Sequence, residues 1–426
     1  MKWSLHTPEG TADRLCEETA AKQEAVGTIM DVFRSFGYHS VETPTFEFYD
    51  VFETNAGNID QQAMFKFFDA QGRILVLRPD LTTPVARMAA TKLKGQTLPL
   101  RLCYSGNAFR SAQGGSGAIQ REFTQCGLEL LGAGGAMADA EVVAATIQAL
   151  TAAGLQNFQL DIGQVGFFKG LCAQAGLNQT DTETLRALVD RKDSLAIEEL
   201  LSGYPISDGL KALCASLPSL FGGIEVIDGI DRSWLDTPAK AALENLKEVY
   251  EILSDYGLED AVSIDLGMVQ DLNYYTGLIF KGFTHGVGFS VCGGGRYDAL
   301  LGEFGANLQA TGVAIGIDRL LSALIFQNKA VPTVAADTLI AYDKASRARG
   351  FQLGAYFRQD GMAVETYLDD DLSGAKAYAA QKGIGGVVAI EGETVRIIDL
   401  KNGTEQVTTY EKLAGGAAHG TGTRIG

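Results

Sequence analysis

An aspartate between two prolines is the first residue of this sequence that could bind a small ligand. Asp80 follows Arg78 and Pro79 and precedes Pro84, and it lies between a short apolar run and a helix-forming run. We therefore expect Asp80 at a junction between a strand and a helix. A carboxylate there could hold the ammonium group of a ligand through a charge-assisted hydrogen bond. The alternative is that Asp80 only caps the following helix.

A second set of polar residues lies on the two segments before and after a loop rich in glycine and serine. Arg110 directly precedes this loop, and a guanidinium in such a place could clamp an anion. After the loop, Gln125, Gly127 and Glu129 alternate with other residues and so share one face of an expected strand. These side chains could line a ligand site, or they could form a solvated sheet face.

Two adjacent tyrosines form the third group. Tyr274 and Tyr275 stand between Asn273 and Thr276, and together these residues would line a cleft with groups suited to a small polar ligand. The alternative is a pair of core aromatics on a β-hairpin.

Three consecutive glycines precede an arginine in the fourth group. Gly293–Gly295 would let a ligand or another backbone approach closely, and Arg296 follows them. Farther along, Arg319 lies near the start of an expected helix, where a guanidinium could stack on or pair with a ligand. The spacing differs from that of a phosphate-binding P-loop, so no P-loop is predicted.

The elements that would position these groups follow from apolar periodicity. Val26, Ile29, Met30 and Phe33 have helical spacing, and Gly37 suits the end of that helix. The expected elements after it are a strand ending at Pro44, a hairpin across 65–77, helices over 84–93, 138–153 and 316–327, and strands over 98–104, 121–131, 262–266, 278–280 and 288–291. Residues 167–255 are predicted to form a mainly helical insertion.

The sequence also predicts a second domain. Residues 1–330 would form the core, and Val331–Thr333 would form a linker. Strands then alternate with helices over 334–412, which indicates a small α/β domain with a largely parallel sheet. The remaining residues, 413–426, have no apolar pattern, so we expect a disordered tail.

Composition excludes several classes of function. The 426 residues include 35 Lys and Arg against 52 Asp and Glu, a net charge of −17, which argues against a general nucleic-acid binder. No apolar run is long enough for a membrane span, and no secretory signal is recognisable. Six cysteines without C-x-x-C spacing favour free thiols in a reducing cytoplasm and predict no metal site. We expect no cofactor.

The order of these groups resembles class II aminoacyl-tRNA synthetases, in particular the histidyl-tRNA synthetase family. Pro44 is similar to the proline of motif 1, the segments 109–110 and 121–123 to motif 2, residues 316–320 to motif 3, and residues 272–277 to the histidine-specific signature. The resemblance covers about residues 1–327. It implies an α+β fold, with an antiparallel sheet, flanking helices, and a homodimer formed through motif 1.

The departures from that family point to a paralogous family. Gln270 replaces an arginine of the histidine signature, Asp271 replaces a glycine, and the loop 111–120 lacks the charges of motif 2. Losing a fixed cation removes stabilisation where negative charge gathers during adenylation. A chain of this kind resembles the regulatory subunits of ATP phosphoribosyltransferase. The alternatives are a divergent, active histidyl-tRNA synthetase and an amino-acid sensor with another partner.

The resemblance implies a role and a site. Proteins of that family work with a short-form catalytic subunit in the first step of histidine biosynthesis, with histidine as the feedback effector, and no tRNA is expected as a partner. Asp80, Thr82 and Gln125 would hold the α-amino group of histidine, whereas Glu129 and Tyr274 or Tyr275 would reach its imidazole. Arg110 completes the predicted set. The alternative is that histidine binds at a subunit interface.

Overall fold

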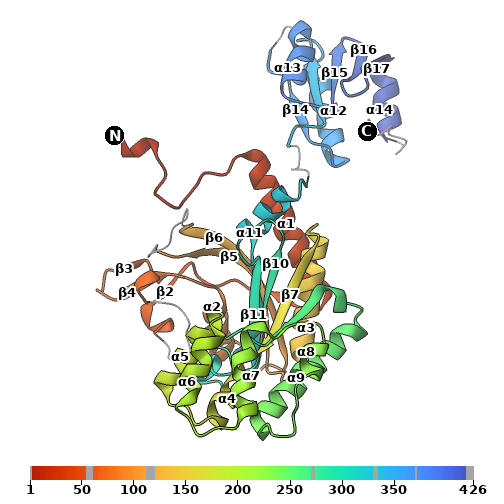
Figure 1. Cartoon of the computed structure of the whole chain (residues 1–426). Helices are drawn as coiled ribbons and strands as arrows, with labels where there is room; N and C mark the ends of the chain where they lie inside the picture. Colours follow the sequence, from red (N-terminus) through yellow and green to blue (C-terminus); the bar gives the residue numbers. More distant parts are fainter. Residues whose placement is uncertain are drawn as a thin grey trace. The chain divides into compact units, whose positions relative to one another are not determined.

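The computed structural model describes residues 2–53, 61–111, 120–269, 274–329, 334–369 and 372–418. The chain divides into two compact units, residues 1–331 and residues 332–426 (Figure 1). Each unit has its own hydrophobic core. The predicted linker, 331–333, lies outside the described residues.

The described part of the first unit is built on a nine-stranded sheet. The six central strands pair in antiparallel fashion, whereas β1 pairs with β5, and β7 with β9, in parallel. In spatial order the strands are β1 (His39–Ser40), β5 (Leu100–Phe109), β6 (Glu122–Leu131), β12 (Ala310–Gly316), β11 (Cys292–Arg296), β10 (Leu278–Thr284), β7 (Phe158–Gln164), β9 (Val262–Asp265) and β8 (Phe221–Gly222). The predicted antiparallel sheet with flanking helices is confirmed.

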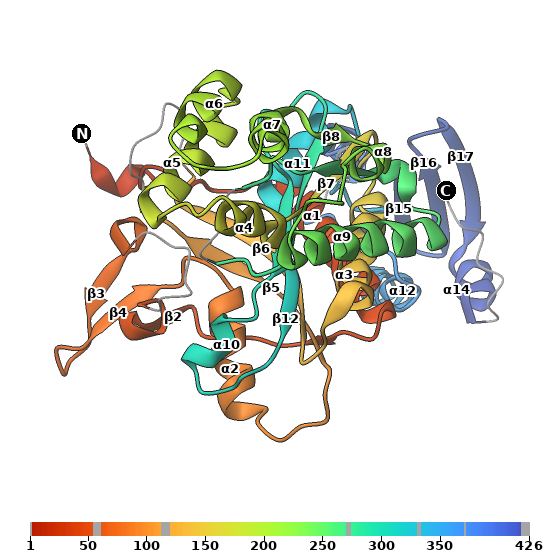
Figure 2. The same ribbon diagram turned by 60° about the horizontal axis from the view of Figure 1, so that its bottom comes forward.

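Two sets of helices cover the central strands. The first set is α1 (Cys16–Ser35), α3 (Gly135–Ala152) and α11 (Ile317–Phe326), and the second is α2 (Thr82–Lys92) with α10 (Leu300–Glu303). Helices α2 and α10 lie side by side (Figure 2). Alternation along β6 separates the two layers: Cys126 and Leu128 join the core that contains α1 and α3, whereas Leu131 joins the core of α2 and α10. Gln125 and Glu129 share the face of Leu131.

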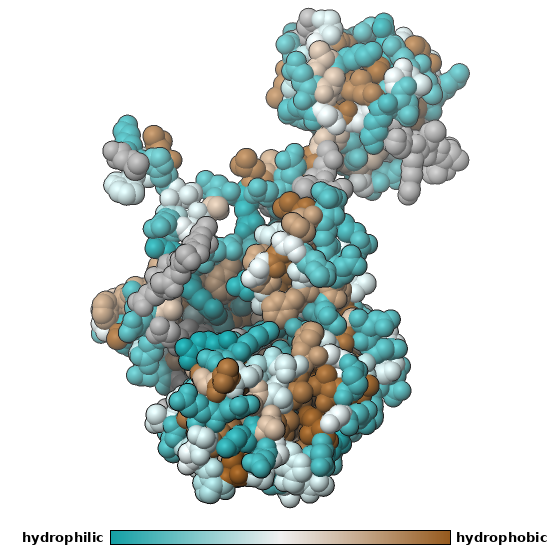
Figure 3. Space-filling view, viewed as in Figure 1, coloured by the Kyte–Doolittle hydropathy of each residue, from teal (hydrophilic) through white to brown (hydrophobic). Residues whose placement is uncertain are grey.

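The predicted helical insertion is present. Its described helices are α4 (Val165–Gln174), α5 (Gln179–Asp190), α6 (Ser194–Ser202), α7 (Asp208–Ser216), α8 (Glu225–Asp228) and α9 (Thr237–Asp255). Side chains at Asn178, Asp193, Ser207 and Asp236 accept hydrogen bonds from the first turns of α5, α6, α7 and α9. Hydrophobic residues gather at the surface among the insertion helices (Figure 3). The strand β8 within the insertion was not predicted.

A separate three-stranded sheet contains the predicted hairpin. Strands β3 (Lys66–Phe68) and β4 (Ile74–Leu77) are antiparallel, and β2 (Phe46–Phe48) pairs with the other side of β4. The carboxylate of Asp69 accepts hydrogen bonds from the backbone of Gln71 and Arg73, at 2.8 and 2.9 Å. Gly72 has a φ of +78°, a conformation that favours glycine in such a turn.

Two predicted strands of the first unit are misplaced. The strand expected to end at Pro44 ends at Ser40, because in this segment only His39 and Ser40 pair with β5. The strand expected over 288–291 instead covers Cys292–Arg296, which includes the three glycines. This strand lies between β10 and β12, and a side chain on Gly294 would overlap the carbonyl oxygen of Gly312. Close backbone packing therefore selects residues of low strand propensity.

The second unit is a small α/β domain with a mixed sheet. Its strands are β14 (Val364–Thr366), β13 (Thr338–Tyr342), β15 (Gly386–Glu391), β16 (Thr394–Asp399) and β17 (Thr404–Thr409), and its longer helices are α12 (Arg347–Gln359), α13 (Ala375–Gln381) and α14 (Tyr410–Ala418). The first three strands are parallel, and β16 and β17 are antiparallel to their neighbours. The prediction of a largely parallel sheet is therefore correct for β14, β13 and β15 and wrong for β16 and β17.

The predicted disordered tail is wrong over 413–418. These residues belong to α14, and Leu413 packs partly buried against the small core around Leu353 and Val388. The apolar contact comes from a tertiary neighbour, so no local periodicity signals it. Residues 419–426 lie outside the described residues.

Candidate functional site

A cavity of about 150 Å³ opens on the face of the central sheet that carries α2. All seven residues predicted for a ligand site line it, although they come from four separate stretches of the chain. The cavity is lined by Asp80, Thr82, Arg110, Gln125, Glu129, Tyr274 and Tyr275, and also by Thr83, Gly293, Gly294, Tyr297, Gly312, Val313 and Ala314.

A buried carboxyl group forms one wall of the cavity. Glu129 is 1% exposed, and both of its oxygens accept hydrogen bonds from tyrosine hydroxyls. Tyr104 donates to Oε1 at 3.0 Å, and Tyr297 donates to Oε2. The Tyr104 hydroxyl also lies 3.3 Å from Oγ1 of Thr82. The two tyrosines fix the orientation of the carboxyl group without neutralising its charge.

Burial governs protonation in this cluster. Loss of water raises the pKa of Glu129 to about 8, although the hydrogen bond from Tyr297 opposes this shift. Burial, followed by the charge of Glu129, raises the pKa of Tyr104 and of Tyr297 well above the usual value. Tyrosines therefore remain donors, and Glu129 can be neutral or ionised near neutral pH.

Asp80 both caps a helix and lines the cavity. Its Oδ1 accepts a hydrogen bond from the backbone of Thr83 at 2.8 Å, and its Oδ2 accepts from the Thr83 hydroxyl at 3.2 Å. Asp80 thus caps the first turn of α2, and the same carboxylate lines the cavity. Burial raises the pKa of Asp80, while the Thr83 backbone and the charge of Arg110 act in the opposite direction.

Polar groups of Gln125 and Arg110 face the same cavity. The Gln125 Oε1 atom is buried and has no hydrogen-bond partner among the described residues. The Arg110 guanidinium donates to the carbonyl of Pro79 at 3.3 Å and lies 5.5 Å from the centre of the Phe123 ring. The cavity therefore offers an uncommitted acceptor and a cation to a small polar ligand.

The aromatic wall contains one tyrosine that sequence reasoning did not assign. Tyr274 meets Tyr275 edge to face, with ring centres 4.8 Å apart, and it stacks on Tyr297 at 5.5 Å and 15°. Sequence reasoning did not assign Tyr297, which lines the cavity, or Tyr104, because their hydrogen bonds to Glu129 depend on the pairing of strands. Tyr274 and Tyr275 also pack against the core of α2, so the core interpretation describes part of their role.

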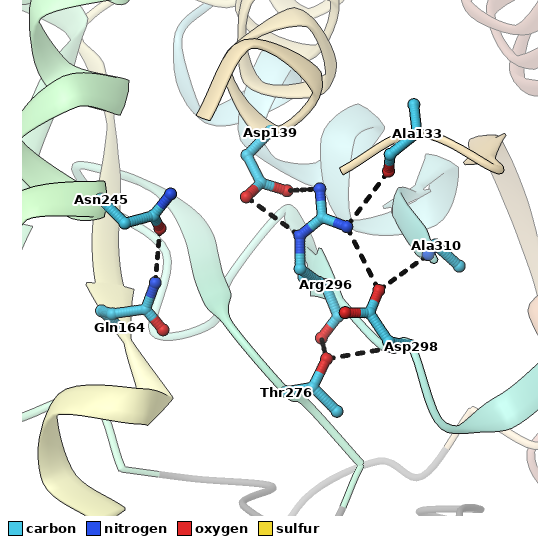
Figure 4. A network of polar contacts seen from close by, with 8 residues as sticks. All are labelled: Ala133, Asp139, Gln164, Asn245, Thr276, Arg296, Asp298 and Ala310. Carbon is cyan, nitrogen blue, oxygen red and sulfur yellow. Dashed lines mark hydrogen bonds and ion pairs between the residues drawn. The ribbon is translucent and has the colours of Figure 1, made fainter. Parts of the chain in front are cut away.

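Arg296 and Asp139 form a buried ion pair, and Figure 4 shows the polar contacts around it. Arg296 donates to both carboxylate oxygens of Asp139 on α3, at 2.8 and 3.1 Å. Its third nitrogen donates to the carbonyl of Ala133 and to Oδ1 of Asp298, both at 3.2 Å. The described contacts of the Arg296 side chain are thus all with protein groups, and Arg296 is not among the residues that line the cavity.

Arg319 contacts protein groups in the described structure. Its guanidinium donates to the carbonyl of Ser290 at 2.9 Å and lies 5.5 Å from the centre of the Phe289 ring. The neighbouring Asp318 accepts a hydrogen bond from the backbone of Thr124 at 2.8 Å and pairs with Arg14. This part of the motif ties α11 to β6 and to the N-terminal segment.

Residues 270–273, with Gln270 and Asp271, and residues 112–119 of the loop lie outside the described residues. Among the residues that the structure does describe, no helix has the length and apolarity needed to cross a membrane, and no cluster of side chains could hold a metal ion.

Comparison with protein families and solved structures defines the class. Residues 10–320 match the family model described as histidyl-tRNA synthetase. The crystal structure of histidyl-tRNA synthetase from Nostoc sp. PCC 7120 has a TM-score of 0.82 and 22% identity, and the match covers 97% of this chain and 99% of that one. At this identity the likeness shows the fold alone, which is the histidyl-tRNA synthetase fold.

Closer relatives specify the family. A protein of Acetivibrio thermocellus is 48% identical over 97% of this chain and 99% of its own length, and it is named ATP phosphoribosyltransferase regulatory subunit. A Bacillus halodurans structure, described as an ATP phosphoribosyltransferase regulatory subunit/histidyl-tRNA synthetase, has 34% identity and a TM-score of 0.80, with 91% of this chain and 98% of that one covered. The chain belongs to the family of ATP phosphoribosyltransferase regulatory subunits, and its role is non-catalytic.

Proposed function

We propose that this regulatory subunit binds histidine in the cavity described above and passes the signal to a catalytic chain. The partner would be a short-form ATP phosphoribosyltransferase catalytic subunit, and the reaction would be the first step of histidine biosynthesis. The proposal rests on the resemblance to the family and on one observation above all. A buried carboxyl group, held by two tyrosine hydroxyls, lies in a cavity with an uncommitted amide oxygen and a cation.

The lining groups match the chemistry of a histidine zwitterion. Asp80, Thr82 and Gln125 offer oxygens to the α-amino group, and the Arg110 guanidinium offers donors to the α-carboxylate. A neutral imidazole has one N–H donor and one acceptor nitrogen. With a pKa of about 8, Glu129 can donate to the acceptor nitrogen when protonated or accept from the N–H when ionised. This versatility supports the assignment of Glu129 to the imidazole.

The assembly and location are part of the same proposal. By resemblance, two copies would form a homodimer through the segment around Pro44, within a larger hetero-oligomer. Free thiols support a cytoplasmic location, since five of the six cysteines are buried and none of the six is in a disulfide. Residues 333–426 carry 10 Lys and Arg against 12 Asp and Glu, a charge of −2, which supports assembly rather than tRNA binding.

Co-purification with the catalytic subunit tests the proposal most directly. The complex should show phosphoribosyltransferase activity that histidine inhibits, and calorimetry of the full chain should detect histidine binding. Glu129→Ala should weaken inhibition at least tenfold, because the imidazole loses its partner. Assembly should remain intact. Inhibition that stays unchanged in both Glu129→Ala and Asp80→Ala complexes would place the effector site elsewhere, such as a subunit interface.

A further inference from the structure

The ion pair between Arg296 and Asp139 of helix α3 is drawn in Figure 4, and neither residue is among those that line the cavity. Arg296 is 6% exposed and Asp139 is 1% exposed. Loss of either charge would leave the other buried without a full partner, which is costly in a protein interior. The position of Arg296 is therefore strongly determined by α3.

The first connection between Arg296 and the cavity runs through the next residue in the chain. Tyr297 directly follows Arg296 and donates its hydroxyl hydrogen to Glu129 Oε2. Its ring also stacks on Tyr274. Because Tyr297 and Arg296 are neighbours on one backbone, holding the Arg296 side chain against Asp139 restricts where the tyrosine hydroxyl can lie.

The second connection runs through the Arg296 backbone. Its carbonyl oxygen accepts hydrogen bonds from the backbone of Thr276 at 2.7 Å and from the Thr276 hydroxyl at 3.3 Å. The same hydroxyl accepts from the backbone of Asp298 at 3.1 Å. Thr276 directly follows Tyr275, so the residue that anchors Tyr297 also anchors the tyrosine pair.

We infer that Asp139 and Arg296 are positioning residues for the histidine site, an inference that rests on the proposed function. They fix Tyr297 on Glu129 and the Tyr274–Tyr275 segment on the cavity without touching the ligand. A histidine imidazole would therefore meet a carboxyl group whose orientation is set from outside the cavity, in the way that outer hydrogen-bond partners orient metal ligands.

A second ion pair on the same helix provides a matched control. Arg101 donates to both oxygens of Glu141 on α3, each at 2.8 Å, in the same two-bond geometry as Arg296 and Asp139. Neither Arg101 nor Glu141 lines the cavity, and neither is bonded to a residue that does. The two pairs share chemistry and helix. They differ in their connection to the cavity and in burial, because the side chains of Arg101 and Glu141 are 32% and 18% exposed, whereas those of Arg296 and Asp139 are 8% and 1% exposed.

Calorimetric titration of the full chain with L-histidine tests the inference. Asp139→Asn should weaken histidine binding about tenfold, a typical effect of removing an outer partner. The same change in a Tyr297→Phe background should cost no more than about threefold, because residues that act through one another are not additive. Glu141→Gln should change thermal stability but leave the histidine affinity within about twofold.

The possible results distinguish failure of the proposed function from failure of the positioning role. If the unaltered chain and its complex bind no histidine, the proposed function fails and this inference fails with it. If they bind histidine but Asp139→Asn binds equally well, or loses the full tenfold in the Tyr297→Phe background too, only the inference fails. Should Asp139→Asn not fold, Arg296→Lys keeps the positive charge but loses the two-bond geometry with Asp139, and unchanged histidine affinity in that variant would overturn the inference.

Discussion

Glu129 and Gly312 face each other on the paired strands β6 and β12, and the carboxyl group of Glu129 fills the space that a side chain at residue 312 would need. An added Cβ at Gly312 would overlap Glu129 Oε2 and would lie 2.6 Å from the carbonyl oxygen of Leu128. Because Gly312 has no side chain, β12 leaves room for the buried carboxyl group of Glu129 on β6.

Gly312→Ala should therefore displace Glu129 from its tyrosine partners. We expect a loss of about 1–3 kcal/mol in the free energy of unfolding, as overpacked sites show, and at least a tenfold loss of histidine affinity. Gly293→Ala is the matched control, because Gly293 also lines the cavity and an added Cβ would meet no atom closer than 3.9 Å. Urea unfolding and calorimetry measure both quantities. Equal effects of the two substitutions would contradict the assignment.

The raised pKa of Glu129 predicts a pH-dependent stability. The pKa of Glu129 is about 8 in the folded chain, whereas its ordinary value, which applies to the unfolded chain, is 4.5. Between these two pH values the folded chain therefore keeps a proton on Glu129 that the unfolded chain has lost. Stability should then fall as the pH rises from about 4.5 to 8, and the loss should be complete above 8. Glu129→Gln lacks this titration.

Glu129→Gln should therefore stabilise the histidine-free chain at high pH. The variant should exceed the unaltered chain by about 1–3 kcal/mol at pH 8.5 and by much less at pH 5. It should also lose histidine affinity, since an uncharged amide cannot replace the carboxyl group in both protonation states. Thermal unfolding at the two pH values gives the comparison. A stability difference that is the same at pH 5 and pH 8.5 would show that Glu129 does not titrate in this range.

Thiol labelling should distinguish one cysteine from the other five. Cys16 is exposed, whereas the others are buried. Burial raises the pKa of Cys126, Cys172, Cys214 and Cys292 to about 12, so these groups form almost no reactive thiolate at neutral pH. A native chain should react rapidly with one equivalent of a thiol reagent and with six after denaturation. Cys16→Ser should abolish the rapid reaction.

The purified chain should not activate histidine. The relatives that define the family are named regulatory subunits, and by the resemblance Gln270 takes the place of a synthetase arginine that supports adenylation. Histidine-dependent exchange between ATP and pyrophosphate should remain at the level of a control without protein. Exchange well above that level would favour the alternative of a divergent synthetase.

Local patterns and the family resemblance together located half of the residues that line the cavity, but not the hydrogen-bond partners of Glu129. Alternation placed Gln125 and Glu129 on one face of β6, and the structure puts both on the cavity. The contact between Tyr297 and Glu129 spans 168 residues of sequence, and only the pairing of β6, β12 and β11 brings the two together. Long-range register is not encoded in the periodicity of either segment alone.

The errors in the fold have a similar origin. Strand β11 consists largely of glycine, and its strand geometry comes from two neighbouring strands. Strand β17 is polar and mostly exposed, with no alternation of apolar residues. Tertiary pairing overrides local propensity in β11, and in β17 it provides the order that no apolar alternation signals.

The pairing of β6 with β12 also sets an order of events during synthesis of the protein. Residues 122–131 leave the ribosome long before residues 310–316, and the whole insertion lies between them. Contacts of such sequence separation form late, because the chain between them must first be ordered. A growing chain can therefore complete the Glu129 pocket only after most of the first unit has emerged. If the proposed function holds, truncated chains would lack the histidine site and would not respond to histidine.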